Sequence, residues 1–230
     1  MSKKTFGGVG HGGIDPGAVA NGLKESDINL DIAFAWKVEL ERHGVEVKLS
    51  RYKNENDNLN EEIRECNSFN PDLAIDFHTN AGGGDGFEVY HTIGGGLGKT
   101  LAQNIEKEVV ALGQNSRGVK TRKNSSGKDY YGFIRLTKCP ANIIECAFID
   151  NDKDIAIVDT KEERIKFGKA VAKATLKTLG IQYKEENKPS TSTFYRVVCG
   201  SYTQRSNADA QIKALEKAGF KNSFIDIYKE

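Results

Sequence analysis

The chain has 230 residues, and 38% of them are hydrophobic, which suffices for one full-sized domain and a small appendage. Its 33 basic and 32 acidic residues leave a formal net charge of +1, so there is no electrostatic reason to expect nucleic acid or an anionic membrane as a partner. No apolar run is long enough to span a bilayer, and no apolar signal segment follows Lys3 and Lys4, so we expect synthesis in the cytoplasm and action elsewhere only after release.

Strand-like and helix-like segments alternate over the first 180 residues. Short apolar runs predict strands over residues 4–9, 45–49, 73–77, 86–90 and 143–144. Helical spacing predicts helices from Ser26, an N-cap candidate, to Gly44, over 60–66 and 97–112, and from the capping box of Thr160 and Glu163 to Gly180. Strands separated by helices predict an α/β fold, with a mostly parallel sheet and helices on both of its faces.

The pattern changes after the last of these helices. Residues 185–193 are polar and nearly free of apolar side chains, which is typical of a flexible linker. Residues 194–230 then predict a small βαβ unit, with strands over 195–199 and 224–228 and a helix between them. Because this unit is too short to bury an independent core comfortably, we expect it to be an appendage to a main domain over residues 1–184.

The most unusual motif is GHGGIDPG at residues 10–17. A histidine among glycines, here His11, fits a turn that brings an imidazole and open backbone to a ligand. His78 ends a buried strand, Glu145 ends a short apolar strand, and Glu25 lies just before the first long helix. Because functional groups collect at the carboxyl ends of strands in open α/β sheets, these four side chains are predicted to meet at one edge of the sheet.

Two imidazoles and one carboxylate form the ligand set of a catalytic zinc ion that keeps its fourth position for water. The set of His11, Glu25 and His78 has this composition, and a further carboxylate, Glu145, fits the proton transfer that hydrolysis requires. The alternative, from the residues alone, is four unrelated polar residues at strand ends, because their convergence is inferred and their spacing along the chain is irregular.

The other histidines and the cysteines have simpler interpretations. His43, beside Arg42, fits a solvated position at a helix C-terminus, and His91 follows a strand as a structural or substrate-rim residue. The four cysteines contain no Cys-x-x-Cys pair, so we expect reduced and mostly buried thiols and no thiolate metal site.

Four blocks of the sequence carry a family resemblance. They are GHGGIDPGA, GLKESDINL, FHTNA and IECAFIDN, at residues 10–18, 22–30, 77–81 and 144–151. In their order and spacing they resemble the zinc-dependent N-acetylmuramoyl-L-alanine amidases, the family called Amidase_3, over about residues 4–180. The first strand departs from the family pattern, since FGGV at residues 6–9 replaces a more apolar run.

The resemblance implies one zinc ion held by His11, Glu25 and His78, with Glu145 as the catalytic acid and base. The implied reaction cleaves the amide between the lactyl group of N-acetylmuramic acid and the L-alanine of the stem peptide in peptidoglycan. The implied fold is a six-stranded mixed sheet with flanking helices. Asn80, in the third block, is a candidate substrate-binding residue.

The C-terminal unit resembles the start of a SPOR-type repeat, through YRVVCGSY at residues 195–202, NADA at 207–210 and KAGF at 217–220. Such modules bind the glycan strands of peptidoglycan. A full module has two strand–helix–strand halves in one sheet, whereas this chain has one. We therefore hypothesise a homodimer in which two copies of residues 194–230 complete one sheet; the sequence does not identify glycan-binding residues.

These features favour a cell-wall hydrolase with a wall-targeting appendage, of the prophage endolysin or mother-cell lytic type. A zinc peptidase that cuts within the stem peptide is the alternative enzyme, because the same four groups would serve any amide hydrolysis. A non-catalytic wall-binding protein is the alternative outside enzymes, although all four active groups are present. A nucleic-acid module at the C-terminus is disfavoured, because residues 194–230 carry six basic and four acidic side chains.

Overall fold

A computed structural model describes residues 2–56, 58–186, 198–220 and 223–227 of the chain. The chain divides into two compact units, Met1–Lys184 and Glu185–Glu230. In the described residues no helix is both long and apolar enough to cross a membrane.

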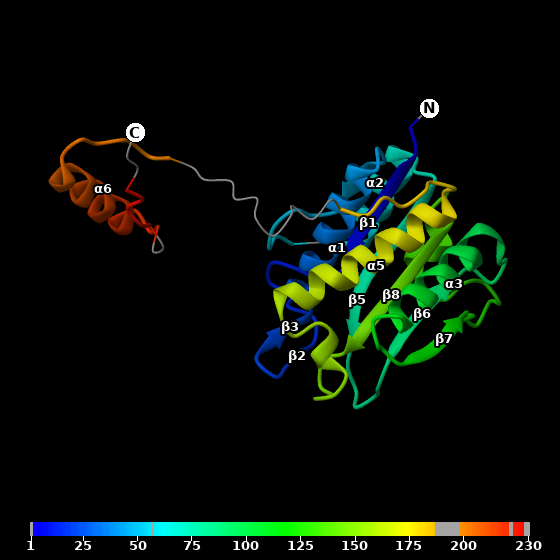
Figure 1. The fold of residues 1–230 in the computed structure, drawn as a ribbon. Coiled ribbons are helices and arrows are strands. Elements are labelled where there is room, and N and C mark those ends of the chain that lie inside the picture. The colour runs from blue at the N-terminus through cyan, green and yellow to red at the C-terminus, as the bar shows by residue number, and fades with distance from the viewer. Residues whose placement is uncertain (1, 57, 187–197, 221–222, 228–230) are drawn as a thin grey trace. The chain divides into compact units, whose positions relative to one another are not determined.

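The first unit contains a six-stranded sheet in the order β4-β1-β5-β8-β6-β7 (Figure 1). Its strands are β1 (Lys4–Val9), β4 (Glu46–Leu49), β5 (Leu73–Asn80), β6 (Phe87–His91), β7 (Ser116–Lys120) and β8 (Ala141–Phe148). Every neighbouring pair is parallel except β6 and β8, which are antiparallel. The predicted mostly parallel, mixed sheet is confirmed.

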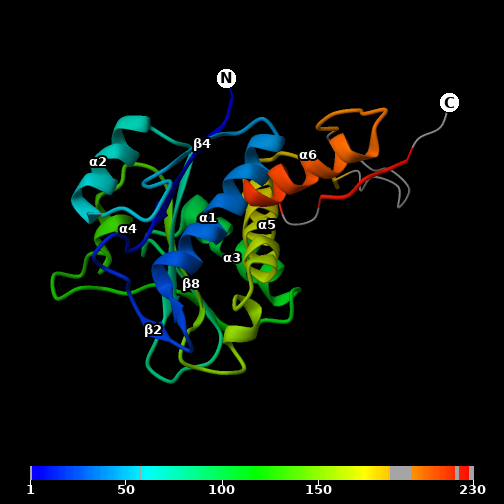
Figure 2. The same cartoon turned by 90° about the vertical axis from the view of Figure 1, so that its left-hand side faces the viewer.

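Helices cover both faces of the sheet, as Figure 2 shows. One face carries the long helices α1 (Glu25–Arg42), α3 (Gly96–Val110) and α5 (Lys161–Thr178). The other face carries two shorter helices, α2 (Leu59–Phe69) and α4 (Gly132–Leu136). The cover is therefore thick on one face and thin on the other.

The larger core lies under the long helices. Trp36 and Phe77 pack edge to face with ring centroids 5.4 Å apart, and the indole N–H of Trp36 donates to Thr175 Oγ1 at 3.1 Å. Burial of such apolar surface is the main stabilising contribution to the fold. A smaller cluster that includes Phe6 and Phe133 lies under α2 and α4.

At the two glycines of β1, neighbouring side chains leave no room for a Cβ. A Cβ on Gly7 would lie 2.7 Å from Leu49 Cδ2, and one on Gly8 would lie 1.8 Å from Glu62 Oε1. β1 still pairs in parallel with both β4 and β5. The departure of this strand from the family pattern is thus explained by close packing on both of its faces.

Several predicted boundaries need correction. α1 begins at Glu25, and Ser26 is not its N-cap; Ser26 is buried, and its carbonyl oxygen accepts from the Arg51 guanidinium at 2.7 Å. β5 extends past His78, and Glu145 lies in the middle of β8.

Four short elements were not predicted, because segments of two to five residues carry little periodicity. They are β7, α4 and the hairpin of β2 (Val19–Ala20) and β3 (Leu23–Lys24). Thr160 caps α5 as predicted, since its Oγ1 accepts from the Glu163 N–H, whereas the Glu163 carboxylate of the predicted capping box pairs with Lys166.

The second unit contains helix α6 (Arg205–Lys217), none of whose residues is fully buried. The described parts of the two predicted strands, at 198–199 and 224–227, are not strands; residues 195–197 and 228 lie outside the described residues. Two isolated strands without further partners are marginal in water, which accounts for the difference.

We expect Gly168→Ala to lower the free energy of unfolding by about 1–3 kcal/mol, although alanine is the better helix former. A Cβ on Gly168, in α5, would lie 2.5 Å from the carbonyl oxygen of Ile32 in α1, so the two helices would have to separate. Urea denaturation would measure the effect. The matched control is Gly98→Ala in α3, where the nearest atom is 3.7 Å away; equal effects of the two substitutions would contradict the explanation.

Candidate metal and catalytic site

The turn after β1 presents His11 at the edge of the sheet. His11 has a φ of 64°, and the turn is held by paired backbone hydrogen bonds between Gly12 and Asp15. The Nδ1 atom of His11 lies 2.8 Å from Asp15 Oδ2. Gly10 leaves room for the second imidazole, because a Cβ there would lie 2.2 Å from His78 Cε1.

Glu25 returns to the same edge because the hairpin of β2 and β3 turns the chain back on itself. Its Oε2 accepts from the Ala18 N–H at 2.9 Å, and its Oε1 accepts from the Thr79 N–H at 3.0 Å. Gly17 is required at the bend, since it has a φ of 65° and a Cβ there would lie 2.6 Å from Glu25 Oε2. The carboxylate is therefore fixed by backbone groups of two other segments.

One oxygen of this carboxylate joins the two imidazoles. Glu25 Oε1 lies 3.1 Å from His78 Nδ1 and 3.3 Å from His11 Nε2. One ligand atom from each of the three residues lies within 4.8 Å of the others. Ligands bound tetrahedrally at 2.0–2.1 Å from a metal lie about 3.3 Å apart, so this donor set fits one metal ion.

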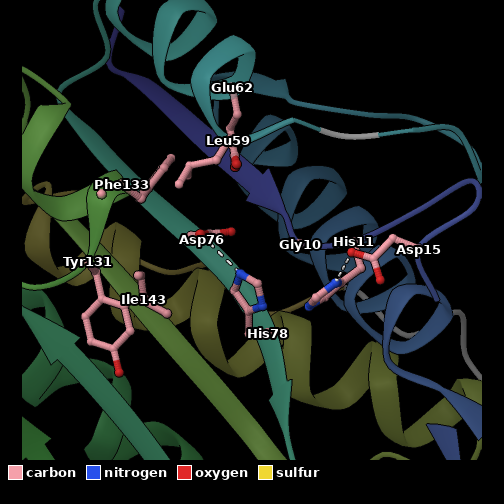
Figure 3. A pocket seen from close by; sticks show the side chains of 11 residues that line it. Gly10, His11, Asp15, Leu59, Glu62, Asp76, His78, Tyr131, Phe133 and Ile143 are labelled. Atoms are coloured by element: carbon pink, nitrogen blue, oxygen red, sulfur yellow. Dashed lines mark hydrogen bonds and ion pairs between the residues drawn. The ribbon is translucent and has the colours of Figure 1, made fainter. Parts of the chain in front are cut away.

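The outward nitrogen of each imidazole faces a carboxylate. Asp15 lies against His11 Nδ1, and Asp76 Oδ2 lies 3.3 Å from His78 Nε2 (Figure 3). Carboxylates in this position fix the tautomer and the orientation of metal-binding histidines. Asp15 was predicted only as part of a turn, and Asp76 was not predicted as a site residue. The signal for Asp76 is its place two residues before His78 on the same face of a strand.

The charges at the site favour a cation. Burial opposes ionisation of Glu25, but hydrogen bonds with His11 and His78 outweigh it and hold the pKa of its carboxyl well below the usual range. The hydrogen bond with Glu25 is the main reason that the pKa of His11 is raised. Burial lowers the pKa of His78, but Asp76 and Glu25 raise it further, so the net shift is upward. The carboxylates thus attract positive charge, which protons or a metal ion would supply.

Glu145 lies between two charged neighbours in the sheet. It pairs with His78 on β5 and with Glu88 on β6, and paired residues on adjacent strands direct their side chains to the same face. Burial, only partly opposed by the charge of His78 and reinforced by Glu25 and other carboxylates, raises the pKa of Glu145 to about 7. A carboxyl with this pKa can both accept and donate a proton near neutral pH.

A pocket of about 270 Å³ opens beside the imidazoles, on the face covered by α2 and α4. Asp76 Oδ1 is buried there, with no hydrogen-bond partner among the described residues. Figure 3 shows His78 and Asp76 along the floor and residues of α2 and α4 around them. The lining residues are Gly10, His11, Asp15, Leu59, Glu62, Asp76, His78, Tyr131, Gly132, Phe133 and Ile143.

The other candidate residues lie apart from this pocket. Asn80 ends β5 and does not line the pocket; its side-chain oxygen accepts from the Ala81 N–H. His43 caps α1 as predicted, but its side chain is 2% exposed and not solvated, because it bonds the Glu39 carbonyl and the Lys184 N–H. His91 is buried against its own loop.

Two protein-family patterns match the chain. The pattern described as N-acetylmuramoyl-L-alanine amidase matches residues 8–177, and the pattern described as SPOR domain matches residues 168–226. The two overlap within α5, which packs on α1 and α3 in the first unit. The first part of the SPOR match, residues 168–184, therefore belongs to the first unit, and the remainder, residues 185–226, belongs to the second.

Relatives of similar length are found in a bacterium and in a phage. The chain is 33% identical over 221 residues to the sporulation-specific N-acetylmuramoyl-L-alanine amidase of Bacillus subtilis (strain 168), covering 94% of this chain and 82% of that protein. It is also 33% identical over 214 residues to an endolysin of Bacillus phage SPP1, covering 86% and 76% of the two chains.

Solved structures share the fold of the first unit. Cwp6 from Clostridium difficile superposes with a TM-score of 0.76 at 32% identity, over 78% of this chain and 30% of that one. The catalytic domain of CwlV, an N-acetylmuramoyl-L-alanine amidase from Bacillus (Paenibacillus) polymyxa, gives 0.70 at 22% identity, over 78% of this chain and 99% of that one. The latter similarity concerns the fold alone.

We expect Glu145→Gln to stabilise the metal-free protein at pH 8 and to have no such effect at pH 4. Above pH 7 the carboxyl is ionised in both the folded and the unfolded state, and its burial costs the folded state on the order of 2–3 kcal/mol. At pH 4 the carboxyl is largely protonated in both states, so the cost disappears. Thermal unfolding with a chelator present would measure the difference.

The control for this measurement is Glu46→Gln on β4, whose side chain is exposed. A glutamate in water carries no burial cost, so this substitution should not reproduce the dependence on pH. Equal stabilisation by Glu145→Gln at both pH values would show that burial of charge is not its cause.

Proposed function

The chain belongs to the N-acetylmuramoyl-L-alanine amidase family, and we propose that His11, Glu25 and His78 hold a single zinc ion in its active site. It is a peptidoglycan amidase, which cleaves the amide between N-acetylmuramic acid and the L-alanine of the stem peptide. The observation that carries the zinc proposal is the approach of both imidazoles to one oxygen of Glu25, at 3.1 and 3.3 Å. Nitrogen and carboxylate ligands without thiolate are typical of a catalytic zinc site.

Asp15 and Asp76 are proposed as positioning residues for the two histidines. Each accepts a hydrogen bond from the outward nitrogen, so His11 keeps Nε2 and His78 keeps Nδ1 for the metal. The two histidines bind the metal through different ring nitrogens because Asp15 bonds Nδ1 of His11, whereas Asp76 bonds Nε2 of His78. Loss of such an outer carboxylate typically lowers metal affinity by about 10–100-fold.

Glu145 is proposed as the acid and base of the hydrolysis. When bound, zinc polarises the scissile carbonyl and activates the attacking water. Glu145 accepts a proton from that water and then donates it to the nitrogen of the leaving L-alanine, so no proton is gained or lost overall. Its neighbour Glu88 is ion-paired with Arg117 and with Lys120, whose Nζ lies 2.8 Å away. These two ion pairs favour the ionised form of the Glu88 carboxyl. Glu145 has no such partner cation among the described residues and is therefore the carboxyl that we assign to proton exchange.

The pocket beside His78 is proposed to take the part of the substrate next to the scissile amide. It opens directly from the metal ligands, and Tyr131 and Phe133 give it apolar walls against which a peptide can pack. A role of Asn80 in substrate binding stays a prediction.

The two units are proposed to divide catalysis and attachment. Residues 1–184 form the catalytic domain, 185–193 the linker and 194–230 a SPOR-like half-module for binding peptidoglycan or for dimerisation. Helix α6 has no fully buried residue, which supports the idea that this half-module is completed by a second copy.

The enzyme is proposed to be made in the cytoplasm and to act on the wall after release, as a prophage endolysin or a mother-cell lytic enzyme. Its similarity to a phage endolysin supports the first role, and its similarity to a sporulation-specific amidase supports the second.

We expect His78→Ala to lose the metal and Glu145→Gln to keep it. His78 supplies one of three ligands, so its removal should leave less than one zinc per chain by elemental analysis. Glu145→Gln should retain one zinc per chain but lower kcat by about 10²–10⁴-fold, because the proton transfer is lost. A chelator should inactivate the wild-type enzyme, and added zinc should restore it. Full zinc retention by His78→Ala would remove this residue from the ligand set, and unchanged turnover by Glu145→Gln would remove its proposed role.

We expect the full chain to be a dimer in solution and a variant ending at residue 184 to be a monomer. The physical reason is that a half-module gains a complete sheet only from a second copy. Light scattering coupled to size exclusion would give both molar masses. A monomeric full chain would contradict the dimer without affecting the zinc proposal.

A further inference from the structure

Two cysteines outside the active site lie side by side. Cys66 is on α2, and Cys139 is in the segment between α4 and β8; their Sγ atoms are 3.9 Å apart. Both are free thiols. Cys66 is fully buried, whereas Cys139 is partly exposed, so Cys139 is the member of the pair that lies nearer the surface.

The surroundings hold the pair together. Asn67, next to Cys66, donates its side-chain N–H to the Leu136 carbonyl at 3.0 Å and accepts from the Lys138 N–H at 2.7 Å. Cys66 also belongs to the small apolar cluster under α2 and α4, against which Cys139 packs. The approach of the two sulfurs is thus fixed by packing on both sides.

The two thiols differ in their readiness to react. The hydrogen bond with Cys139, reinforced by burial, raises the pKa of the Cys66 thiol. The same hydrogen bond lowers the pKa of Cys139. The partly exposed cysteine is therefore also the one with more thiolate character, which is the nucleophilic form.

We propose that Cys66 and Cys139 form a disulfide when the protein meets a small-molecule disulfide. In the first step the Cys139 thiolate attacks one sulfur of that molecule, forms a mixed disulfide and releases one small thiol. In the second step the Cys66 sulfur loses its proton, attacks Cys139 Sγ and releases the second small thiol. Two protein thiols are oxidised and one small disulfide is reduced to two thiols, so electrons and protons balance.

The link would join the walls of the substrate pocket. Leu59 and Glu62 line the pocket from α2, and Tyr131 and Phe133 line it from the start of α4, the helix that precedes Cys139. The disulfide closes a separation of 73 residues along the chain and ties α2 to the segment after α4. Peptidoglycan lies outside the cytoplasm. Thiols are kept reduced in the cytoplasm but not outside it, so the enzyme meets its substrate under conditions that allow the disulfide.

The test treats the full-length, zinc-loaded protein with oxidised glutathione, blocks remaining thiols by alkylation and maps its peptides by mass spectrometry. We expect a Cys66–Cys139 peptide pair with a mass about 2 Da below the sum of the reduced peptides. We also expect the unfolding temperature to rise by about 5 °C or more and to return after reduction. Cys199→Ser, which removes the exposed thiol of the second unit, should behave like the wild type.

The matched variant is Cys139→Ser, which should show no such rise on oxidation. Its unfolding temperature under reducing conditions shows whether it folds like the wild type; if it does not, Cys66→Ala gives the same comparison from the other side of the bond. A stable adduct of glutathione on Cys139, two unmodified thiols after treatment, or a link through Cys199 would each overturn the proposal. Zinc content measured on the same samples keeps this result separate from the fate of the metal site.

Discussion

One carboxylate oxygen, Oε1 of Glu25, joins the three segments from which the site is built. It lies within 3.3 Å of His11 and His78 and accepts the backbone N–H of Thr79. The turn after β1, the first residue of α1 and the end of β5 are thus tied to one atom. A buried carboxylate is costly without partners, so the surrounding glycines and the hairpin of β2 and β3 are the arrangement that supplies them.

The register of the sheet sets the chemistry around that atom. Because β8 lies between β5 and β6, Glu145 is placed beside His78 on one strand and Glu88 on the other. Arg117 and Lys120 pair with Glu88, yet the charge of Glu88 still contributes to raising the pKa of Glu145. The pKa of Glu145, about 7, then reflects mainly its own burial, which is the property that a proton carrier at neutral pH needs.

The sequence was most informative where local chemistry dictates local structure. The glycines around His11 predicted a turn, apolar runs predicted the sheet, and the four family blocks predicted the ligand set. It was less informative where tertiary contacts decide. Asp76 shares a strand face with His78, but its approach to the imidazole is known only from the structure. The absence of a side chain at Gly8 is likewise explained only once Glu62 is seen to fill the space of a Cβ. The strands predicted in the second unit depend on pairing partners, and residues 198–220 and 223–227, which the structure describes there, contain none.

The two faces of the sheet have separate tasks, and this explains where the molecule is least constrained. Most of the apolar core lies under α1, α3 and α5, so the larger part of the stabilising burial is on that face. The other face keeps a pocket and a buried oxygen of Asp76 that has no hydrogen-bond partner within the part of the chain that the structure describes, a cost that a fully packed face would not carry. The cover over the pocket is correspondingly thin, held by the small cluster around Phe133 and by the bonds of Asn67. Cys66 and Cys139 meet at this point, where a single covalent link would restrain the pocket walls without touching a metal ligand.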